Sequence, residues 1–393
     1  MGRKVSSDNA TVVAATLEVV EQILNEMGLA DFSSESILVE PDSLDGDVVL
    51  RSKADFGRFI GGFSIRLGCL PYALQAVERL TVRQFCERYA RESYPETPGT
   101  PLERDRYTLA GPARAERAVF TPQIFPICFV LGCGRSGTTL FRAMLNVHEA
   151  LWAPGELHLA QYDTMAERAT RANPILRRTF VPEAGSRFGE TPDSFYQRLE
   201  SWERESLPTP EVYRRLHEAN PQALIVDKCP PYSAWPEDLA WIAHHFPRAR
   251  FIHIIRSPHD VIRSMVRMQF YKGALQMFEP GINPYHVAEI LWFRHNSNIA
   301  ELTSRLAKER TLLVRYEDLV ANPQTTLSEV CNLLGVDYEL RMENPYEHNA
   351  GPVALGAGDP QVNRMTEVEK REPSKPLYAV GAQCEELARG YGY

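Results

Sequence analysis

The sequence lacks clustered cysteines, long apolar runs and an excess of positive charge. Its seven cysteines stand singly among 393 residues, with no Cys-x-x-Cys pair and no histidine group at metal-ligand spacing, so we predict reduced thiols and no metal site. No apolar run approaches the roughly 20 residues that cross a membrane. The formal net charge of -8 offers nucleic acid no general attraction. We therefore expect a cytoplasmic protein that has neither a membrane nor nucleic acid as a partner.

The chain is long enough for one large domain and a smaller one. Residues 93 to 122 are rich in proline, glycine and charged residues and have no apolar period, which is typical of a linker. We predict a helical N-terminal module over residues 1–92, a linker over 93–122 and the main domain over 123–393.

From residue 123 onward, short apolar segments alternate with segments of helical period. Short apolar strands bounded by polar turns are typical of a parallel sheet that is covered on both faces. The pattern predicts an α/β fold, with a parallel sheet flanked by helices and a ligand at the carboxyl ends of the strands. The predicted strands are 125–132, 223–228, 250–256 and 311–318, and the predicted helices are 138–148, 236–246, 258–269, 287–307 and 326–336.

The first predicted strand leads into "GCGRSGTTLFRAML", which has the form of a phosphate-binding loop. A glycine-rich turn before a helix presents backbone N–H groups and the helix dipole to an anion. Gly132 and Gly137 have the spacing of the pattern G-x-x-x-x-G-K-[ST], which makes the sheet P-loop-like, but Thr138 stands where that pattern has lysine. A nucleotide-hydrolysing site thereby loses its central charge. Arg135 offers a cation whose planar fork suits a phosphate or sulfate group.

This loop resembles the 5'-phosphosulfate loop of sulfotransferases that use 3'-phosphoadenosine 5'-phosphosulfate (PAPS), in particular the branch that has arginine where the cytosolic enzymes have lysine. The resemblance implies that PAPS is the co-substrate and that its desulfated form, PAP, is the product. The residues that it implies for binding the 5'-phosphosulfate are Gly134, Arg135, Ser136, Gly137, Thr138 and Thr139.

A second motif, "FIHIIRSPHDVIRSMVRM", suits the 3'-phosphate that distinguishes PAPS from ATP. A predicted strand ends at Arg256, and the helix that follows brings Ser264 eight residues later. The arrangement resembles the family's 3'-phosphate motif, which implies that Arg256 and Ser264 bind this phosphate. Pro258 and Asp260 would also suit an ordinary helix start.

Transfer of a sulfuryl group to a hydroxyl or amine needs in-line geometry and a base for the acceptor proton. In "HEALWAPGELHLAQYDTM", Glu156 falls where the family's arginine branch places a catalytic glutamate, and we predict that it is the general base. His158 is the alternative base, because two positions on in an extended segment it would point with Glu156. The segment is also similar to "PPELHLLPF" of sulfotransferase domains in modular polyketide synthases, which implies a role in secondary metabolism.

Lys228, in "IVDKCPPYS", ends a predicted strand and resembles the family's "DKxP" segment. The resemblance implies a catalytic role, in which Lys228 stabilises the leaving phosphate or the moving sulfuryl group. It could instead pair with Asp227. Because Asp227 follows an apolar strand, it also resembles a Walker B aspartate. A P-loop kinase or NTPase-like phosphoryl transferase is therefore the alternative function.

Three further segments resemble the family. Residues 312–323, "LLVRYEDLVANP", are similar to its "RYEDL" segment beside the nucleotide, although Tyr316-Glu317-Asp318 could equally be structural. Residues 286–302 and 355–363 are similar to segments of polyketide-synthase sulfotransferases. This similarity implies that the acceptor is a small molecule or a carrier-tethered chain, whose pocket we expect to be lined by 160–215 and 265–290.

In the N-terminal module, helical patterns over 10–28, 53–63 and 80–91 have the spacing of an acyl carrier domain. Ser52 would then be the attachment serine, but it lacks the usual Asp-Ser-Leu context. A working carrier, a degenerate carrier-like or docking module, and an unrelated helical element that forms an oligomer are the three interpretations that the sequence leaves open.

Overall fold

In the computed structural model, the chain forms two compact units. The first unit comprises Met1–Pro98 and Ser264–Pro284, and the second comprises Gly99–Arg263 and Tyr285–Tyr393. The division into a module, a linker and a main domain stays a prediction. The described residues are 7–29, 32–33, 35–39, 49, 59, 80–93, 102, 117–172, 180–278, 282–347, 368 and 379–393.

The first unit contains two of the predicted N-terminal helices, α1 (Ser7–Glu26) and α3 (Val82–Ser93). The second of these starts later than predicted, because Leu80–Thr81 (β2) pairs antiparallel with Ile37–Val39 (β1). Thr81 and Gln84 each accept a hydrogen bond from the other's backbone N–H, which is a capping box. The helix predicted over 53–63 and the attachment serine lie outside the described residues, apart from Phe59. Buried members of this unit's apolar core are Val20, Ile23, Leu24, Leu38, Phe59, Val82, Phe85 and Cys86.

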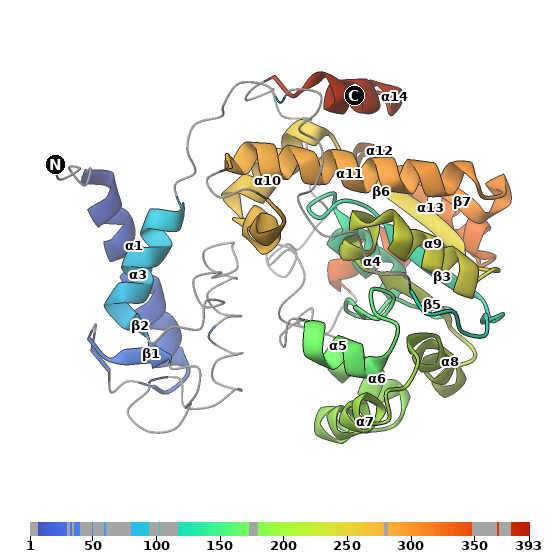
Figure 1. Ribbon diagram of the computed structural model, residues 1–393, viewed down its shortest axis with the longest axis horizontal. Coiled ribbons are helices and arrows are strands. Elements are labelled where there is room, and N and C mark those ends of the chain that lie inside the picture. The colour runs from blue at the N-terminus through green and yellow to red at the C-terminus, as the bar shows by residue number, and fades with distance from the viewer. Residues whose placement is uncertain are drawn as a thin grey trace. The chain divides into compact units, whose positions relative to one another are not determined.

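The second unit is built, within the described residues, on a five-stranded parallel sheet in the order β4-β5-β3-β6-β7. Figure 1 shows β3, β5, β6 and β7 among the helices of this unit. The sequence missed Leu151–Trp152 (β4), which is too short to show a period. It also extended the last strand too far, because Tyr316–Ala321 is a helix, α12. The four predicted strands are otherwise confirmed, as β3 (Ile127–Leu131), β5 (Leu224–Lys228), β6 (Arg250–Ile255) and β7 (Thr311–Arg315).

The helices between these strands were predicted in part. Those confirmed are α4 (Thr138–Asn146), α9 (Pro236–His245), α10 (Pro258–Arg267), α11 (Pro284–Ser304) and α13 (Pro323–Leu334). Besides α12, the unpredicted helices of the described region are α5 (Met165–Arg171), α6 (Val181–Arg187), α7 (Pro192–Arg204), α8 (Thr209–Ala219) and α14 (Ala382–Gly390). Short 3₁₀ segments lie at Pro230–Ala234, Lys308–Arg310, Leu340–Glu343 and Pro345–Glu347, and a longer one lies at Phe270–Met277. No described helix is long and apolar enough to span a bilayer.

Side chains of β3 alternate between two apolar cores, one on each face of the sheet. Phe129 packs with residues of α8 and α9, whereas Val130 packs with residues of α4 and α13. In the register of the sheet, Asp227 lies beside Phe129 and Lys228 lies beside Val130. Neighbouring residues of one strand point to opposite faces. The side chains of Asp227 and Lys228 are therefore directed apart.

Candidate functional site

The glycine-rich loop, residues 132–137, joins the central strand β3 to α4. Its backbone turns sharply, with φ of +71° at Arg135 and +86° at Gly137, and Ser136 N donates to Cys133 O over 3.2 Å. A Cβ at Gly137 would collide with the ring of Tyr316, and one at Gly132 would lie 2.5 Å from the carbonyl oxygen of Ile254. Both glycines are therefore required by neighbouring atoms.

Gly137→Ala is expected to destabilise the protein more than Gly189→Ala. Both positions have a left-handed backbone, at φ of +86° and +67°, which costs a non-glycine residue about 1–2 kcal/mol. Only Gly137 also has a ring in the way, since nothing lies within 4 Å of a Cβ at Gly189, and overpacking adds about 1–3 kcal/mol. Urea unfolding of the two variants measures the difference. Equal losses would mean that Tyr316 moves aside freely.

The loop offers hydroxyl and N–H groups to an anion. The side chains of Ser136, Thr138 and Thr139 are buried there, and Ser136 Oγ has no hydrogen-bond partner among the described residues. Gly137, which precedes α4, has no side chain to cap the helix, and the N–H groups at a helix start are directed toward an anion that binds there. A buried hydroxyl without a partner is costly unless a ligand completes it. These residues therefore fit a phosphate or sulfate group.

Arg256 follows β6 directly. The ring of Tyr316 contacts both its guanidinium group and the glycine-rich loop. The guanidinium group is 4.4 Å from the centre of the Tyr316 ring, the same ring that would collide with a Cβ at Gly137. Arg256 Nη2 lies 3.9 Å from Asp260 Oδ2. The buried Nε of Arg256 has no hydrogen-bond partner among the described residues. Ser264 is one turn beyond Asp260 on α10, so it lies on the same side of the helix.

The turn after β6 is held by residues that the sequence did not single out for this role. Ser257 N donates to Glu317 Oε1 over 3.0 Å, and the hydroxyl of Tyr393 donates to Glu317 Oε2 over 2.6 Å. Trp292 Nε1 donates to the carbonyl oxygen of Arg256 over 2.9 Å. In the "RYEDL" segment, Glu317 therefore holds the turn after β6, and the ring of Tyr316 lies against Gly137 and under Arg256.

The three predicted catalytic residues, Glu156, His158 and Lys228, come together. Their side chains are almost completely buried, with residue exposures of 7%, 3% and 2%. Lys228 Nζ forms an ion pair with Glu156 Oε1, and His158 Nε2 lies 3.2 Å from Glu156 Oε2. Burial by itself would raise the pKa of Glu156, but the charge of Lys228 and the contact with His158 outweigh it and lower the pKa. The suggestion that Lys228 pairs with Asp227 was wrong.

The backbone of His158 also differs from the expected extended form. Its φ of +48° is left-handed, so its contact with Glu156 does not arise from the alternation of an extended chain. Arg168, which is buried on α5, donates to the carbonyl oxygens of His158 and Leu157 over 2.9 and 3.1 Å. These two bonds fix the unusual turn.

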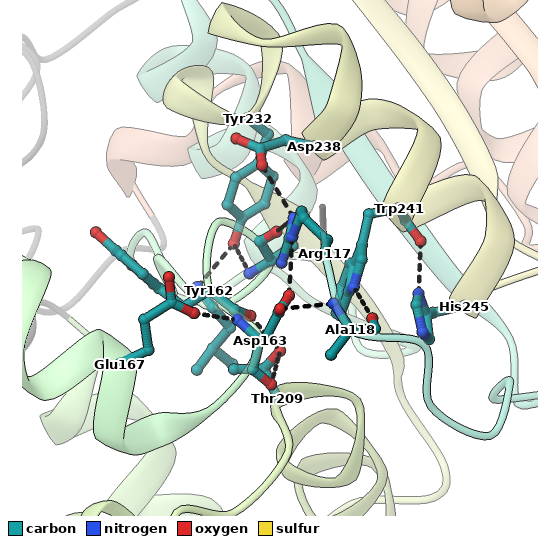
Figure 2. Close-up of polar contacts among 12 residues, drawn as sticks. Arg117, Ala118, Tyr162, Asp163, Glu167, Thr209, Tyr232, Asp238, Trp241 and His245 are labelled. Carbon is teal, nitrogen blue, oxygen red and sulfur yellow. Dashed lines mark hydrogen bonds and ion pairs between the residues drawn. The ribbon is translucent and has the colours of Figure 1, made fainter. Parts of the chain in front are cut away.

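We call residues 153–160 the catalytic loop. They are buried without belonging to a helix or strand, so their backbone groups need other partners. At one end of the loop, Arg117 donates to Ala160 O over 2.7 Å and contacts Asp163 and Asp238 at 2.9 Å each, while its guanidinium group lies over the ring of Trp241 (Figure 2). The end of the predicted linker is thus bonded to the loop.

Asp227 does not lie as a Walker B aspartate would. Its Oδ2 accepts hydrogen bonds from the hydroxyl groups of Tyr213 and Tyr232, the latter over 2.9 Å. The carboxyl group is completely buried, which raises its pKa to about 6 although the tyrosines partly oppose this. The strand directs it away from the face that carries Lys228. The carboxylate therefore acts as a hydrogen-bond acceptor for two buried tyrosines.

One group of three residues has the ligand types of a metal site. Ligand atoms of Glu156, His158 and Cys229 lie within 4.8 Å of one another. However, the imidazole lies between its neighbours, with Nε2 facing the carboxylate and Nδ1 3.4 Å from the sulfur. Burial raises the pKa of the Cys229 thiol well above its usual range. Within this group Glu156 is already paired with Lys228.

Comparison with known proteins gives consistent relatives. Residues 126–339 match the model of the Sulfotransferase family. Among solved structures, the sulfotransferase domain from the curacin biosynthetic pathway is 30% identical, with a TM-score of 0.63 over 69% of this chain and 99% of that domain. The corresponding domain of the Synechococcus PCC 7002 olefin synthase is 29% identical, with a TM-score of 0.63 over 72% and 99%. A putative protein-tyrosine sulfotransferase of Caenorhabditis briggsae is 23% identical over 224 residues, which are 56% of this chain and 69% of that protein.

Proposed function

The chain belongs to the sulfotransferase family, and we propose that its glycine-rich loop, Arg256 and Glu156 perform sulfuryl transfer from PAPS to a hydroxyl or amine. The observation that carries this proposal is the meeting of Glu156 and His158, both in the catalytic loop, with Lys228 of β5. The donor is PAPS. Its 5'-phosphosulfate would lie on Arg135, the loop N–H groups and the hydroxyls of Ser136, Thr138 and Thr139.

The buried ion pair supports separate roles for Glu156 and Lys228 in the reaction. Because its pKa is lowered, Glu156 is ionised at neutral pH and can accept the proton of the acceptor. As the new bond forms between the acceptor atom and sulfur, the bond from sulfur to the 5'-phosphate oxygen breaks, and PAP leaves with that electron pair. Lys228 would neutralise the charge that develops on the leaving oxygen. Positioning and electrostatics would supply most of the rate, as in phosphoryl transfer.

The 3'-phosphate site can be tested with nucleotides. Arg256→Met should weaken PAP binding by about 10- to 100-fold, the usual effect of losing a charged hydrogen bond. Adenosine 5'-phosphate, which lacks the 3'-phosphate, should bind both proteins equally, and the exposed Arg305 provides the control Arg305→Met. Calorimetry measures all three proteins. Equal losses of affinity for both nucleotides would show that Arg256 does not bind the 3'-phosphate. Ser264→Ala would then be tested in the same way.

Calorimetry also tests the kinase alternative. A sulfotransferase should prefer PAP to ATP and bind it without magnesium, because its second phosphate site recognises the 3'-phosphate. Tight magnesium-dependent binding of ATP would overturn the proposal. The place of Asp227 also supports the sulfotransferase, since its Oδ2 accepts from two buried tyrosines and its side chain is directed away from the face that carries Lys228.

The acceptor that we propose is a small molecule or a carrier-tethered chain of secondary metabolism. Support comes from the curacin and olefin synthase domains, 99% of whose length aligns with this chain. A screen with labelled PAPS should offer alcohols, amines, carrier-bound hydroxyacyl chains and tyrosine peptides. Transfer to the peptides alone would instead favour the activity named for the curated relatives.

A further inference from the structure

The catalytic loop is held by side chains from many elements rather than by its own secondary structure. Asn146 and Arg142 of α4 bond the N–H and carbonyl groups of Ala153, and Glu183 of α6 accepts from Gly155 N. With Arg168 and Arg117, these contacts fix both ends and the middle of the loop. One more contact links it to the strand that carries Lys228.

That contact is the hydroxyl group of Tyr232, in the turn after β5. It donates to Asp227 Oδ2 over 2.9 Å and accepts from Leu159 N over 3.1 Å, with Ala160 N at 3.4 Å. All of these groups are buried, so no water competes for them. The hydroxyl therefore joins the end of β5 to a point three residues after Glu156.

Two links thus connect β5 to the loop. Lys228 pairs with Glu156 on one side of the strand, and Asp227 reaches Leu159 through Tyr232 on the other. The ion pair fixes the loop to β5 at Glu156, and the second link fixes it to the same strand three residues later. Together the two links set the distance and the tilt of the loop relative to β5, in addition to the contacts that the helices make.

We propose that Tyr232 is a positioning residue, whose hydroxyl group is oriented by Asp227 and holds the catalytic loop so that Glu156 stays in place beside Lys228. This proposal rests on the function proposed above, in which Glu156 is the base. In this role Tyr232 needs no contact with PAPS or with the acceptor. Its effect on the reaction passes through the position of the carboxylate, and small displacements of a catalytic group are costly.

Tyr213 provides a matched control within the same cluster. Its hydroxyl group also donates to Asp227 Oδ2 and lies 3.2 Å from the hydroxyl of Tyr232. Both rings are completely buried. No described hydrogen bond joins Tyr213 to the catalytic loop. Replacing either tyrosine with phenylalanine removes one buried hydroxyl from Asp227, but only one replacement releases the loop.

The test compares Tyr232→Phe with Tyr213→Phe, using release of PAP from PAPS with water as the acceptor. Tyr232→Phe should lower kcat by about 10- to 100-fold and change the Kd for PAP by less than about twofold. Tyr213→Phe should keep kcat within about threefold of the parent. Its urea midpoint should fall by about as much as that of Tyr232→Phe, because each variant loses one buried hydroxyl group. Equal kcat for the two variants would overturn the proposal, because their effects would then be structural.

A double variant separates this proposal from the function on which it rests. If Tyr232 acts through Glu156, adding Tyr232→Phe to Glu156→Gln should cause little further loss of kcat. Additive losses would refute the positioning role and leave Glu156 as the base. Full activity of Glu156→Gln alone would instead refute the base. Asp227→Asn keeps both hydroxyls and should lower kcat less than Tyr232→Phe; an unchanged kcat would count against the link through Asp227.

Discussion

Glu156→Gln is expected to lower turnover by about 10²- to 10⁴-fold, the usual contribution of a general base. The amide keeps the shape of the side chain but cannot take a proton from the acceptor. Affinity for PAP should stay within about twofold, because the proposed base would act on the acceptor and not on the nucleotide. Labelled PAPS measures turnover and calorimetry measures PAP binding.

The control is Glu149→Gln, since the Glu149 side chain is 81% exposed and lies in the same stretch of chain. It should behave as the parent protein. Normal turnover of Glu156→Gln would remove Glu156 as the base, and His158→Gln would then test the alternative base. Loss of PAP binding together with turnover would show that the variant had disturbed the nucleotide site.

Lys228→Met is expected to destabilise the protein by about 3–5 kcal/mol at neutral pH, because it leaves a buried carboxylate without its cation. The pH dependence should change sign. In the parent, the lowered pKa of Glu156 gives stability that is present above the ordinary carboxyl pKa and is lost as the pH falls. In the variant, burial moves the pKa upward, so the folded state takes up the proton and the penalty shrinks on acidification.

Urea unfolding of parent and variant between about pH 4 and pH 8 spans the ordinary carboxyl pKa and measures this difference. The exposed Lys308 provides the control Lys308→Met. The double variant Lys228→Met/Glu156→Gln should recover much of the stability, since no buried charge is then left alone. His158 is the other titratable group in contact with Glu156. Urea unfolding of His158→Gln over the same pH range measures how much His158 contributes to the pH dependence of stability. Parallel pH profiles for parent and Lys228→Met would contradict the importance of the ion pair.

The main strands could be predicted because their apolar runs, although short, are bounded by polar turns. β4 could not, because Leu151 and Trp152 are paired by the neighbouring strand rather than by a pattern of their own. Tyr316 was assigned to a strand because it continues an apolar run, and only the fold shows its ring against Gly137. Local pattern therefore identified the sheet, whereas long-range packing decided where its elements stop.

The candidate site was predictable as a set of residues but not as a set of contacts. Glu156 and Lys228 were identified separately, yet they are 72 positions apart and meet only through the fold. Asp227 seemed the natural partner of Lys228 because it is adjacent, and strand geometry separates them. Arg117 and Tyr232 gave no signal, since their roles depend on the backbone of a distant loop. The aromatic residue in "DKCPPYS" was the nearest available hint.

Holding the catalytic loop with residues from α4, α5 and α6 has a consequence for attempts to change the acceptor. An engineer who randomises these helices to reshape a binding cavity would also alter Arg168 and Glu183, which bond the loop backbone. Variants would then lose rate because the base had shifted, and a screen would misread that loss as poor acceptor fit. Libraries that keep both residues constant would report on the cavity alone.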